Sequence, residues 1–350
     1  CLASGGAFRA VSVNKHEPHT AYPRWHPIRN FYGPGFTPLP RFGRVRRFCE
    51  RHLPPFGFSR FDGCDLILQC GTPIIWQGCR DSEWARMIWR EIFARLATRG
   101  VPILNLGGGS CYPWERQPAT LAGDQDEAFV RLMLGASRIT TVRDHLARTL
   151  FESIAHPVPQ ICCPAFLAGQ TFASVSQPTR KVLINYMSGG GHYDWGQNIV
   201  AADWSQTMRR LVDILVQQDW EPLFVAHNRE ELELATLIWP KLPRALPASS
   251  WEYFRLAEGA AFGVFNRMHA SVAVAGLGIP SIAVGTDTRN LMVEALGLPV
   301  FYVKDATLEK MQVALDRLIA QRDAESTRLL ALREQTLREY ENILRPFVAA

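Results

Sequence analysis

Short apolar runs alternate with amphipathic stretches over the first half of the chain. The runs have the length and composition of buried β-strands, and the stretches between them have helical periodicity. This alternation predicts a parallel sheet covered by helices. The predicted strands are Asp65–Gln69, Val101–Leu106 and Arg138–Val142, and the predicted helices are Ser82–Arg99, Asp124–Leu134 and one that opens at Asp144.

A second series with the same alternation follows further along the chain. The predicted strands are Lys181–Tyr186, Pro222–Ala226, Ala261–Phe265 and Ile279–Gly285, and the predicted helices are Asp203–Gln217, Glu230–Ile238 and Ala270–Gly278. From Thr307 to about Leu344 the sequence is strongly helical and rich in charge. We therefore predict a second parallel sheet and a long C-terminal helix that packs along one domain or returns to the first.

The two series predict an α/β protein with two Rossmann-like domains. The stretch between them turns polar, with Ser, Gln, Pro and Thr, which is typical of a linker. We expect an N-terminal domain over residues 1–172, a linker over 173–180, a C-terminal domain over 181–303 and a helical segment over 304–350. A chain of 350 residues is long enough for two such cores.

Composition favours a cytoplasmic protein. No apolar stretch approaches the roughly 20 residues that a membrane-spanning helix needs. The eight cysteines include no CxxC pair, and the histidines and acidic residues have no recognisable ligand spacing, so we expect reduced thiols and no metal. Cys111, beside a glycine run, could act as a nucleophile, but we interpret it as structural because no base accompanies it.

The net charge of +5 is too small to indicate a nucleic-acid partner, but its distribution is uneven. Six arginines crowd one short segment interleaved with Pro, Phe and Gly. A solvated loop is the more frequent explanation of such a block. The alternative is a basic N-terminal arm that contacts anionic lipid or a lipid-linked pyrophosphate at the inner face of the membrane. These residues are Arg41, Arg44, Arg46, Arg47, Arg51 and Arg60.

The run Asn266–His269 lies where a predicted strand meets a predicted helix. Ligands of open parallel sheets bind at the carboxyl ends of strands, and a helix start offers backbone N–H groups and a positive dipole end. Arg267 and His269 therefore indicate a site for an anion. The alternative is that Arg267 caps a carbonyl and His269 is an ordinary half-buried histidine.

Two further strand ends carry the same kind of signal. Gly189, Gly190 and Gly191 follow the first strand of the second series and precede His192, and glycine lets backbone N–H groups approach an anion. A simple tight turn explains this run, or Gly107–Gly109, equally well. Arg143 ends a strand of the first series, where it could bind a ligand or form a surface ion pair. Neither a P-loop nor a dinucleotide-binding motif is present.

Together these motifs resemble the polysaccharide pyruvyl transferase family. The resemblance spans roughly Asp65 to Val303, and its specific parts are the Val-Arg-Asp and Arg-Met-His elements. The motifs are Asp65–Ile67, Gly107–Gly109, Thr141–Asp144, Asn185–His192, Asn266–His269 and Gly278–Pro280. The chain departs from the family's pattern at Cys163, where aspartate is common before proline, and no N-terminal strand is evident in the arginine-rich opening.

The resemblance implies a two-domain GT-B-like protein that transfers pyruvate from phosphoenolpyruvate to sugar hydroxyls of a cell-surface polysaccharide or its lipid-linked precursor. It implies no cofactor beyond phosphoenolpyruvate as co-substrate. Arg143, Arg267 and His269 fall on its donor positions, and we expect His269 to be the general acid or to steer phosphate departure. We expect His192 or Asp194 as base. The full expected donor set is Arg143, Arg267, Met268, His269, Gly189, Gly190, Gly191 and His192.

Acceptor contacts are expected mainly from the first domain, whose aromatic and polar residues suit a sugar. Those singled out are Gln69, Trp76, Ser110, Tyr112 and Trp114. Two rival functions share much of this pattern. One is a GT-B glycosyltransferase with a nucleotide-sugar donor, since fold does not determine the donor. The other is a non-catalytic carbohydrate-binding scaffold, in which the positions of the two arginines and His269 would be coincidental.

Overall fold

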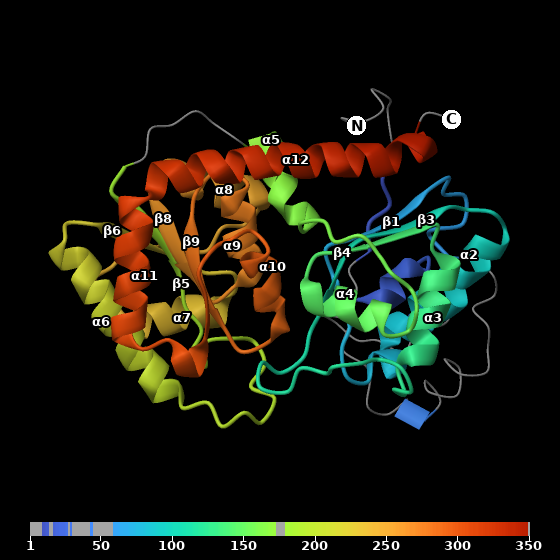
Figure 1. Ribbon diagram of the computed structural model, residues 1–350, viewed down its shortest axis with the longest axis horizontal. Coiled ribbons are helices and arrows are strands. Elements are labelled where there is room, and N and C mark those ends of the chain that lie inside the picture. The colour runs from blue at the N-terminus through green and yellow to red at the C-terminus, as the bar shows by residue number, and fades with distance from the viewer. Residues whose placement is uncertain are drawn as a thin grey trace.

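The computed structural model describes residues 9–13, 17–26, 29, 43–44, 59–172 and 179–348, and it has two α/β bodies joined side by side (Figure 1). Most of the predicted linker and most of the arginine-rich block lie outside the described residues. Of that block, Arg44 and Arg60 are described, and Arg60 donates to the carbonyl of Thr20 at 3.2 Å.

The first sheet is parallel and is built around one long central strand. Its strands are β1 (Ile67–Cys70), β2 (Pro73–Ile75), β3 (Ile103–Ser110) and β4 (Ile139–Val142), and β1, β2 and β4 all pair with β3. Helices cover it: η1 (Pro18–Ala21), η5 (Cys79–Asp81), the continuous pair η6 (Trp84–Phe93) and α2 (Ala94–Thr98), α3 (Glu127–Ala136) and α4 (His145–Glu152).

The glycine run Gly107–Gly109 belongs to β3 and is not the turn after it. A Cβ at Gly107 would lie 2.4 Å from Pro164, one at Gly108 would lie 2.3 Å from Ile74, and one at Gly109 would lie 2.5 Å from Nε of Arg143. The run is therefore glycine because neighbouring groups pack directly on the strand. The interpretation of these residues as a loop after a shorter strand is wrong.

The second sheet has six parallel strands in the order β10-β9-β8-β5-β6-β7. They are β5 (Lys181–Asn185), β6 (Glu221–Val225), β7 (Arg244–Ala245), β8 (Phe262–Phe265), β9 (Ser281–Gly285) and β10 (Val300–Tyr302). Counted within the domain this is the 3-2-1-4-5-6 order of a doubly wound fold, and the order reverses between β5 and β8. The two short edge strands, β7 and β10, were not predicted because two or three residues carry too little periodicity.

Helices pack on both faces of this sheet (Figure 1). They are α6 (Ala201–Gln217), α7 (Arg229–Ile238), α8 (Ser250–Ala257), α9 (Met268–Ala275), η8 (Thr288–Asn290), α10 (Leu291–Glu294) and η9 (Val303–Asp305). Helix α9 begins at Met268, earlier than predicted, so Arg267 is its N-cap residue and His269 lies in its first turn. This start places both side chains next to the carboxyl end of β8.

The C-terminal segment forms α11 (Leu308–Ala320) and α12 (Arg322–Val348), and α12 lies across both domains (Figure 1). Leu329 is buried in a cluster with residues of α9 and α10, whereas Tyr340 is buried against Leu104 and Leu106 of β3. The Tyr340 hydroxyl also donates to the carbonyl of Cys162 at 2.8 Å. Within the described part of the chain, no helix combines the length and apolarity needed to span a bilayer.

The segment that leaves the first domain, η7 (Pro164–Ala168) and α5 (Gly169–Phe172), packs tightly on α9. A Cβ on Gly276 would lie 2.2 Å from the carbonyl oxygen of Phe166, and one on Gly169 would lie 1.8 Å from that of Gly276. Backbone therefore touches backbone beside the helix that carries His269.

Replacing Gly276 with alanine is expected to lower the free energy of unfolding by about 1–3 kcal/mol, because a methyl group is forced against backbone. Urea denaturation measures it. The control is Gly135→Ala in α3, where a Cβ meets nothing within 4 Å and alanine favours the helix. Equal stability of the two variants would contradict the tight contact.

Candidate functional site

A cleft of about 950 Å³ lies between the domains. The first domain contributes Gln69, Gly71, Thr72 and Trp76 to its wall, and the second contributes Tyr193, Trp195, Arg267, His269 and Arg289. These residues lie at or after the carboxyl ends of β1, β2, β5, β8 and β9. The cleft thus lies where doubly wound sheets bind their ligands.

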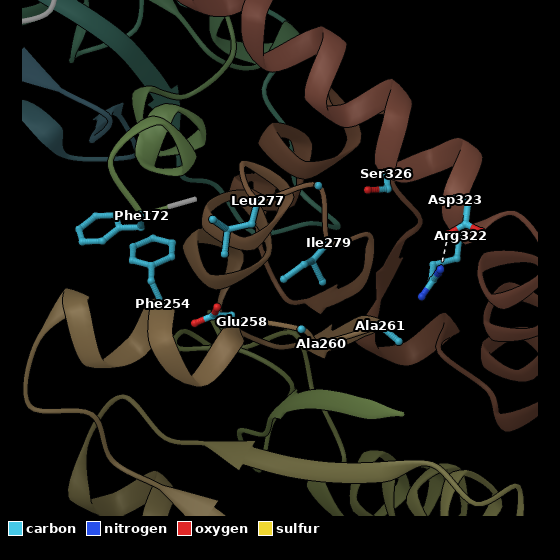
Figure 2. Close-up of a pocket in the computed structure, with 12 residues that line it drawn as sticks. Phe172, Phe254, Glu258, Ala260, Ala261, Leu277, Ile279, Arg322, Asp323 and Ser326 are labelled. Atoms are coloured by element: carbon cyan, nitrogen blue, oxygen red, sulfur yellow. Dashed lines mark hydrogen bonds and ion pairs between the residues drawn. The ribbon is translucent and has the colours of Figure 1, made fainter. Parts of the chain in front are cut away.

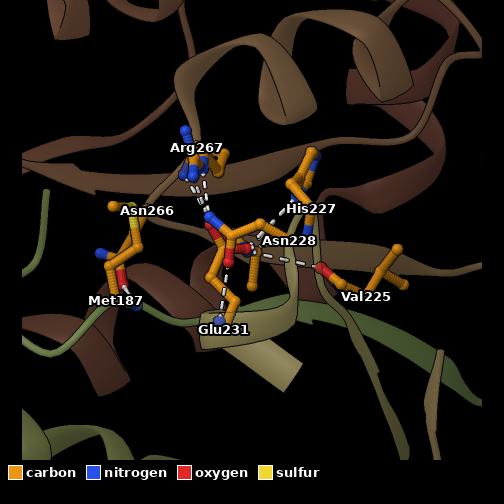
Figure 3. A network of polar contacts seen from close by, with 8 residues as sticks. Met187, Val225, His227, Asn228, Glu231, Asn266 and Arg267 are labelled. Carbon is orange, nitrogen blue, oxygen red and sulfur yellow. Dashed lines mark hydrogen bonds and ion pairs between the residues drawn. The ribbon is translucent and has the colours of Figure 1, made fainter. Parts of the chain in front are cut away.

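Two asparagines fix the backbone at the point where the strand order reverses. They are Asn185 at the end of β5 and Asn266 just after β8, and Figure 3 labels the second of them. Asn185 accepts from the backbone N–H of Arg267 at 3.0 Å and donates to Glu231 at 2.8 Å. Asn266 accepts from the N–H of Met187 and donates to the carbonyl of Val284, both at 2.8 Å. Both side-chain amides therefore connect neighbouring strand ends. Neither of them lines the cleft, whereas Arg267 and His269 do.

Arg267 is held by a carboxylate that sequence reasoning missed. Its Nε donates to Oε1 of Glu231 at 2.8 Å, and its Nη2 contacts the same oxygen (Figure 3). Glu231 follows Asn228, the N-cap of α7, and its side chain is 6% exposed. Burial opposes ionisation of Glu231, but hydrogen bonds from His227 and the Arg267 cation outweigh it and lower its pKa to about 2. Because Nε and Nη2 face Glu231, a ligand in the cleft would meet Nη1.

His269 meets Arg143, so the two most specific motifs of the sequence come together across the domains. Nη1 of Arg143 lies 3.0 Å from Nε2 of His269 and also donates to the carbonyl of Gly71 at 2.5 Å. A guanidinium can only donate, so Nε2 accepts when it bonds to Arg143, whereas the carbonyl of Gly71, 3.2 Å from the same Nε2, can only accept from it. Arg143 and Gly71 of the first domain thus both meet the imidazole of His269, and the protonation of Nε2 decides which hydrogen bond forms.

Arg143 and Arg267 were both expected to bind the donor, but of the two only Arg267 lines the cleft. The Arg143 side chain is fully buried, and its Nε and Nη2 have no hydrogen-bond partner among the described residues. Its Nη1 also lies 3.6 Å from the sulfur of Cys163, the residue that stands where the family often has aspartate. The guanidinium packs beside Gly109 and not on the cleft wall, so it contacts His269 and not the space where a ligand fits.

Arg289 is the second arginine of the cleft wall, and sequence reasoning missed it. It follows β9, and its guanidinium makes two hydrogen bonds to Asp287, of 2.8 and 2.6 Å. The Asp287 carboxylate raises the pKa of Arg289 further, against the opposing effect of burial. The signal was present in the sequence, since Asp287-Thr-Arg289 follows a strand end just as Arg267 does. The wall therefore carries two arginines, each fixed by its own carboxylate.

Most of the other expected donor residues pack inside the second domain. Met268 is 8% exposed and belongs to a hydrophobic cluster. A Cβ on Gly190 would collide with Val303 and one on Gly191 with Thr286, and the N–H of Gly190 already donates to Met187. Close packing thus accounts for Gly190 and Gly191. Gly189 has open space around its Cβ position, and anion contact through this loop stays a prediction.

His192 is exposed and stands beside the two arginines. Burial first, and then the Arg267 and Arg289 cations, lower the pKa of His192 below its usual value. The lowered pKa favours the neutral imidazole at neutral pH, which is the form a base requires.

The five expected acceptor residues divide into two groups. Trp76 and Gln69 line the cleft, although the Gln69 amide is engaged by Asn105 at 2.8 Å and Trp89 at 3.0 Å. The other three lie at the junction of the domains, where they hold the two bodies together. Ser110 contacts Asp144 and Thr288, the N–H of Tyr112 donates to Thr288, and Trp114 stacks on Tyr302 with ring centroids 6.2 Å apart.

A smaller cavity of about 130 Å³ lies near the opposite ends of β8 and β9 (Figure 2). Phe172, Phe254 and Ile279 line it, together with the ion pair of Arg322 and Asp323. It contains none of the cleft's cations. Among the described residues, no three His, Cys, Asp or Glu side chains gather as a metal site would require.

Two parallel-sheet domains with a ligand cleft at their carboxyl edges and a long C-terminal helix define a GT-B-like α/β protein. Within that class, the chain belongs to the polysaccharide pyruvyl transferase family, whose sequence model matches residues 10–288. The fold and the family predicted from the sequence are confirmed.

Three solved structures that resemble this chain have low sequence identity to it and TM-scores below 0.5. A co-structure of S. aureus MnaA with UDP has 13% identity and a TM-score of 0.49, with 81% of this chain and 77% of that chain covered. UDP-GlcNAc 2-epimerase from Neisseria meningitidis bound to UDP-GlcNAc has 11% identity and a TM-score of 0.44, with 79% of this chain and 76% of that chain covered. Acinetobacter baumannii MurG has 13% identity and a TM-score of 0.40, with 72% of this chain and 68% of that chain covered. No curated protein matches significantly.

Proposed function

We propose that this protein transfers pyruvate from phosphoenolpyruvate to two hydroxyls of a sugar in a cell-surface polysaccharide or its lipid-linked precursor, forming a cyclic ketal. The family supports pyruvyl transfer to a polysaccharide. The observation that carries the choice of donor is the trio of Arg267, Arg289 and His269 on one wall of the cleft. C2 of phosphoenolpyruvate carries both a carboxylate and a phosphate, and each arginine, with Nε and Nη2 held by its carboxylate, still has Nη1 to donate to one of these anionic groups.

The chemistry requires a proton donor and stabilisation of negative charge. One sugar hydroxyl forms a bond to C2 and gives its proton to the base, while the acid adds a proton to C3. The bond from C2 to the phosphate oxygen then breaks, the second hydroxyl bonds to C2 and closes the ring, and its proton leaves with the phosphate as hydrogen phosphate. In our proposal Arg267 and Arg289 hold the two anionic groups, and His269 protonates C3 or assists the departing phosphate. Arg143 acts through His269 as a positioning residue. His192, with its lowered pKa, is the proposed base, with Asp194 as the alternative.

The acceptor is proposed to be a glycan or lipid-linked oligosaccharide that contacts Trp76 and the first domain. We propose a cytoplasmic protein at the inner face of the membrane, with the arginine-rich segment as its contact to anionic lipid. The proposed reaction uses no metal, no cofactor and no nucleic acid.

Phosphoenolpyruvate is expected to raise the melting temperature of the protein, whereas UDP- and GDP-sugars are expected to leave it unchanged. Binding to the folded state alone stabilises it by RT ln(1 + [L]/Kd), where [L] is the concentration of free ligand. Arg267→Ala should abolish the shift, and thermal unfolding with each candidate donor measures it. A shift with a nucleotide sugar and none with phosphoenolpyruvate would favour a glycosyltransferase instead.

Arg267→Ala also leaves Glu231 without its cation, so a second variant separates binding from folding. Arg289→Lys removes the guanidinium of the other proposed anion contact and keeps a cation beside the buried carboxylate of Asp287. Arg210→Ala is the control, since Arg210 is an exposed arginine of α6. The proposal requires that both cleft variants lose the response to phosphoenolpyruvate while Arg210→Ala keeps it.

A further inference from the structure

The loop between β5 and α6 brings two aromatic rings to the cleft. Tyr193 and Trp195 both line it, with ring centroids 5.1 Å apart and planes inclined at 55°. The guanidinium of Arg289 lies over Tyr193, 5.0 Å from the ring centroid. One face of Tyr193 is thus covered by a cation, and Trp195 extends the aromatic surface beyond it.

This loop is built as a rigid support. The carbonyl of Tyr193 accepts from Thr286 at 2.7 Å, that of Asp194 accepts from Gln197 at 2.9 Å, and that of Trp195 accepts from Arg116 of the first domain. Three successive carbonyls are therefore fixed, and the last of them ties the loop to the opposite domain. A surface held in this way loses little conformational entropy when a ligand binds.

Trp195 has two costly local features. Its φ is 58°, in the left-handed region that a residue with a Cβ seldom adopts. Its indole Nε1 is buried and has no hydrogen-bond partner among the described residues. Hydrogen bonding of the indole therefore does not explain where the ring lies. Strained backbone of this kind is concentrated at ligand sites, where the surrounding structure enforces it.

We propose that the indole of Trp195, supported by Tyr193, is the surface on which a pyranose ring of the acceptor stacks. The ring would lie between Trp195 and Trp76 on the opposite wall, beside the cleft face of Arg267 and His269. The apolar face of a pyranose packs on an aromatic ring, and the rim of hydroxyls meets polar groups such as Arg289. This inference rests on the proposed function, and it assigns acceptor recognition partly to the second domain, although the acceptor contacts were expected mainly from the first.

The test replaces Trp195 with glycine, which removes the indole and also relieves the left-handed backbone. Asn198→Gly is the matched control, because Asn198 lies in the same loop with φ of 54°, is exposed and does not line the cleft. Binding is followed by saturation-transfer NMR with the methyl β-pyranosides of galactose, glucose and mannose, and with UMP as a nucleotide probe, each with and without phosphoenolpyruvate.

Wild type and Asn198→Gly are expected to bind at least one pyranoside, and Trp195→Gly is expected to bind it about tenfold more weakly with its melting temperature kept or raised. The shift with phosphoenolpyruvate should be the same in all three proteins. Equal pyranoside affinity in Trp195→Gly, or no transfer to any pyranoside in wild type, overturns the inference. So does preferential transfer to UMP, which would make the indole a nucleobase site. Binding of the pyranoside is also measured without phosphoenolpyruvate, so it tests the stacking site alone. If the donor proposal is wrong, phosphoenolpyruvate fails to raise the melting temperature, whatever the result with the pyranoside.

Discussion

Replacing His269 with alanine is expected to lower the turnover of pyruvyl transfer roughly 10²- to 10⁴-fold, the usual contribution of a positioned proton donor. Donor affinity should change far less, since Arg267 and Arg289 remain on the wall of the cleft. Release of phosphate from phosphoenolpyruvate in the presence of acceptor measures kcat, and the thermal shift measures donor binding.

A matched control distinguishes the role from a general effect of losing an imidazole. His156 is exposed on the first domain, and His156→Ala should keep full turnover. If His269→Ala weakened donor binding while kcat stayed at the wild-type value, His269 would be a binding residue and not the acid. A conservative change at the neighbouring positioning residue, Arg143→Lys, should alter the pH profile of kcat, because it changes the hydrogen bond to Nε2 of His269.

Replacing Glu231 with alanine is expected to lower the free energy of unfolding by about 3 kcal/mol. The change removes the carboxylate that pairs with Arg267 and accepts from Asn185, so one cation and one amide lose their buried partner. Urea denaturation at pH 7 measures the loss. Glu230→Ala, next along α7 and exposed, is the control and should change stability by less than about 0.5 kcal/mol.

The same carboxylate predicts a pH dependence. The pKa of Glu231 is about 2 in the folded protein, below its ordinary value, so its contribution to stability is present above that ordinary value and is lost as the pH falls toward 2. Wild type and Glu231→Gln should therefore approach each other in stability between about pH 4.5 and pH 2. A constant difference across this range would show that the charge of Glu231 does not stabilise the fold.

The strand ends that carry the chemistry could be predicted from the sequence, because buried strands and their flanking residues are local patterns. Polar residues directly after a predicted strand were taken as site candidates, and this rule identified Arg267, His269 and Arg143. The same rule at the end of β9 would have identified Arg289. It could not give the partner of Arg267, since Glu231 lies on another strand–helix unit and meets Arg267 only when the sheet is assembled. Glu231 was visible only as an acidic residue near the start of a predicted helix.

The burial of Arg143 could not be predicted for a related reason. The sequence indicated a glycine-rich turn at Gly107–Gly109, and a turn would have left room for a ligand beside the arginine. The structure continues the strand through these glycines, so the space beside Gly109 is filled by the Arg143 guanidinium itself. Likewise, Ser110 and Tyr112 have the chemistry of sugar-binding residues, but their distance from the cleft depends on how the two domains meet.

The path of α12 has a consequence for synthesis on the ribosome. Nascent proteins generally fold domain by domain, beginning at the N-terminus. Here Tyr340 covers Leu104 and Leu106 of the first domain, so that apolar face stays uncovered until translation has passed Tyr340. The first domain is therefore expected to stay incompletely packed while the second is translated. Until α12 docks, the growing chain should bind chaperones that recognise exposed apolar surface.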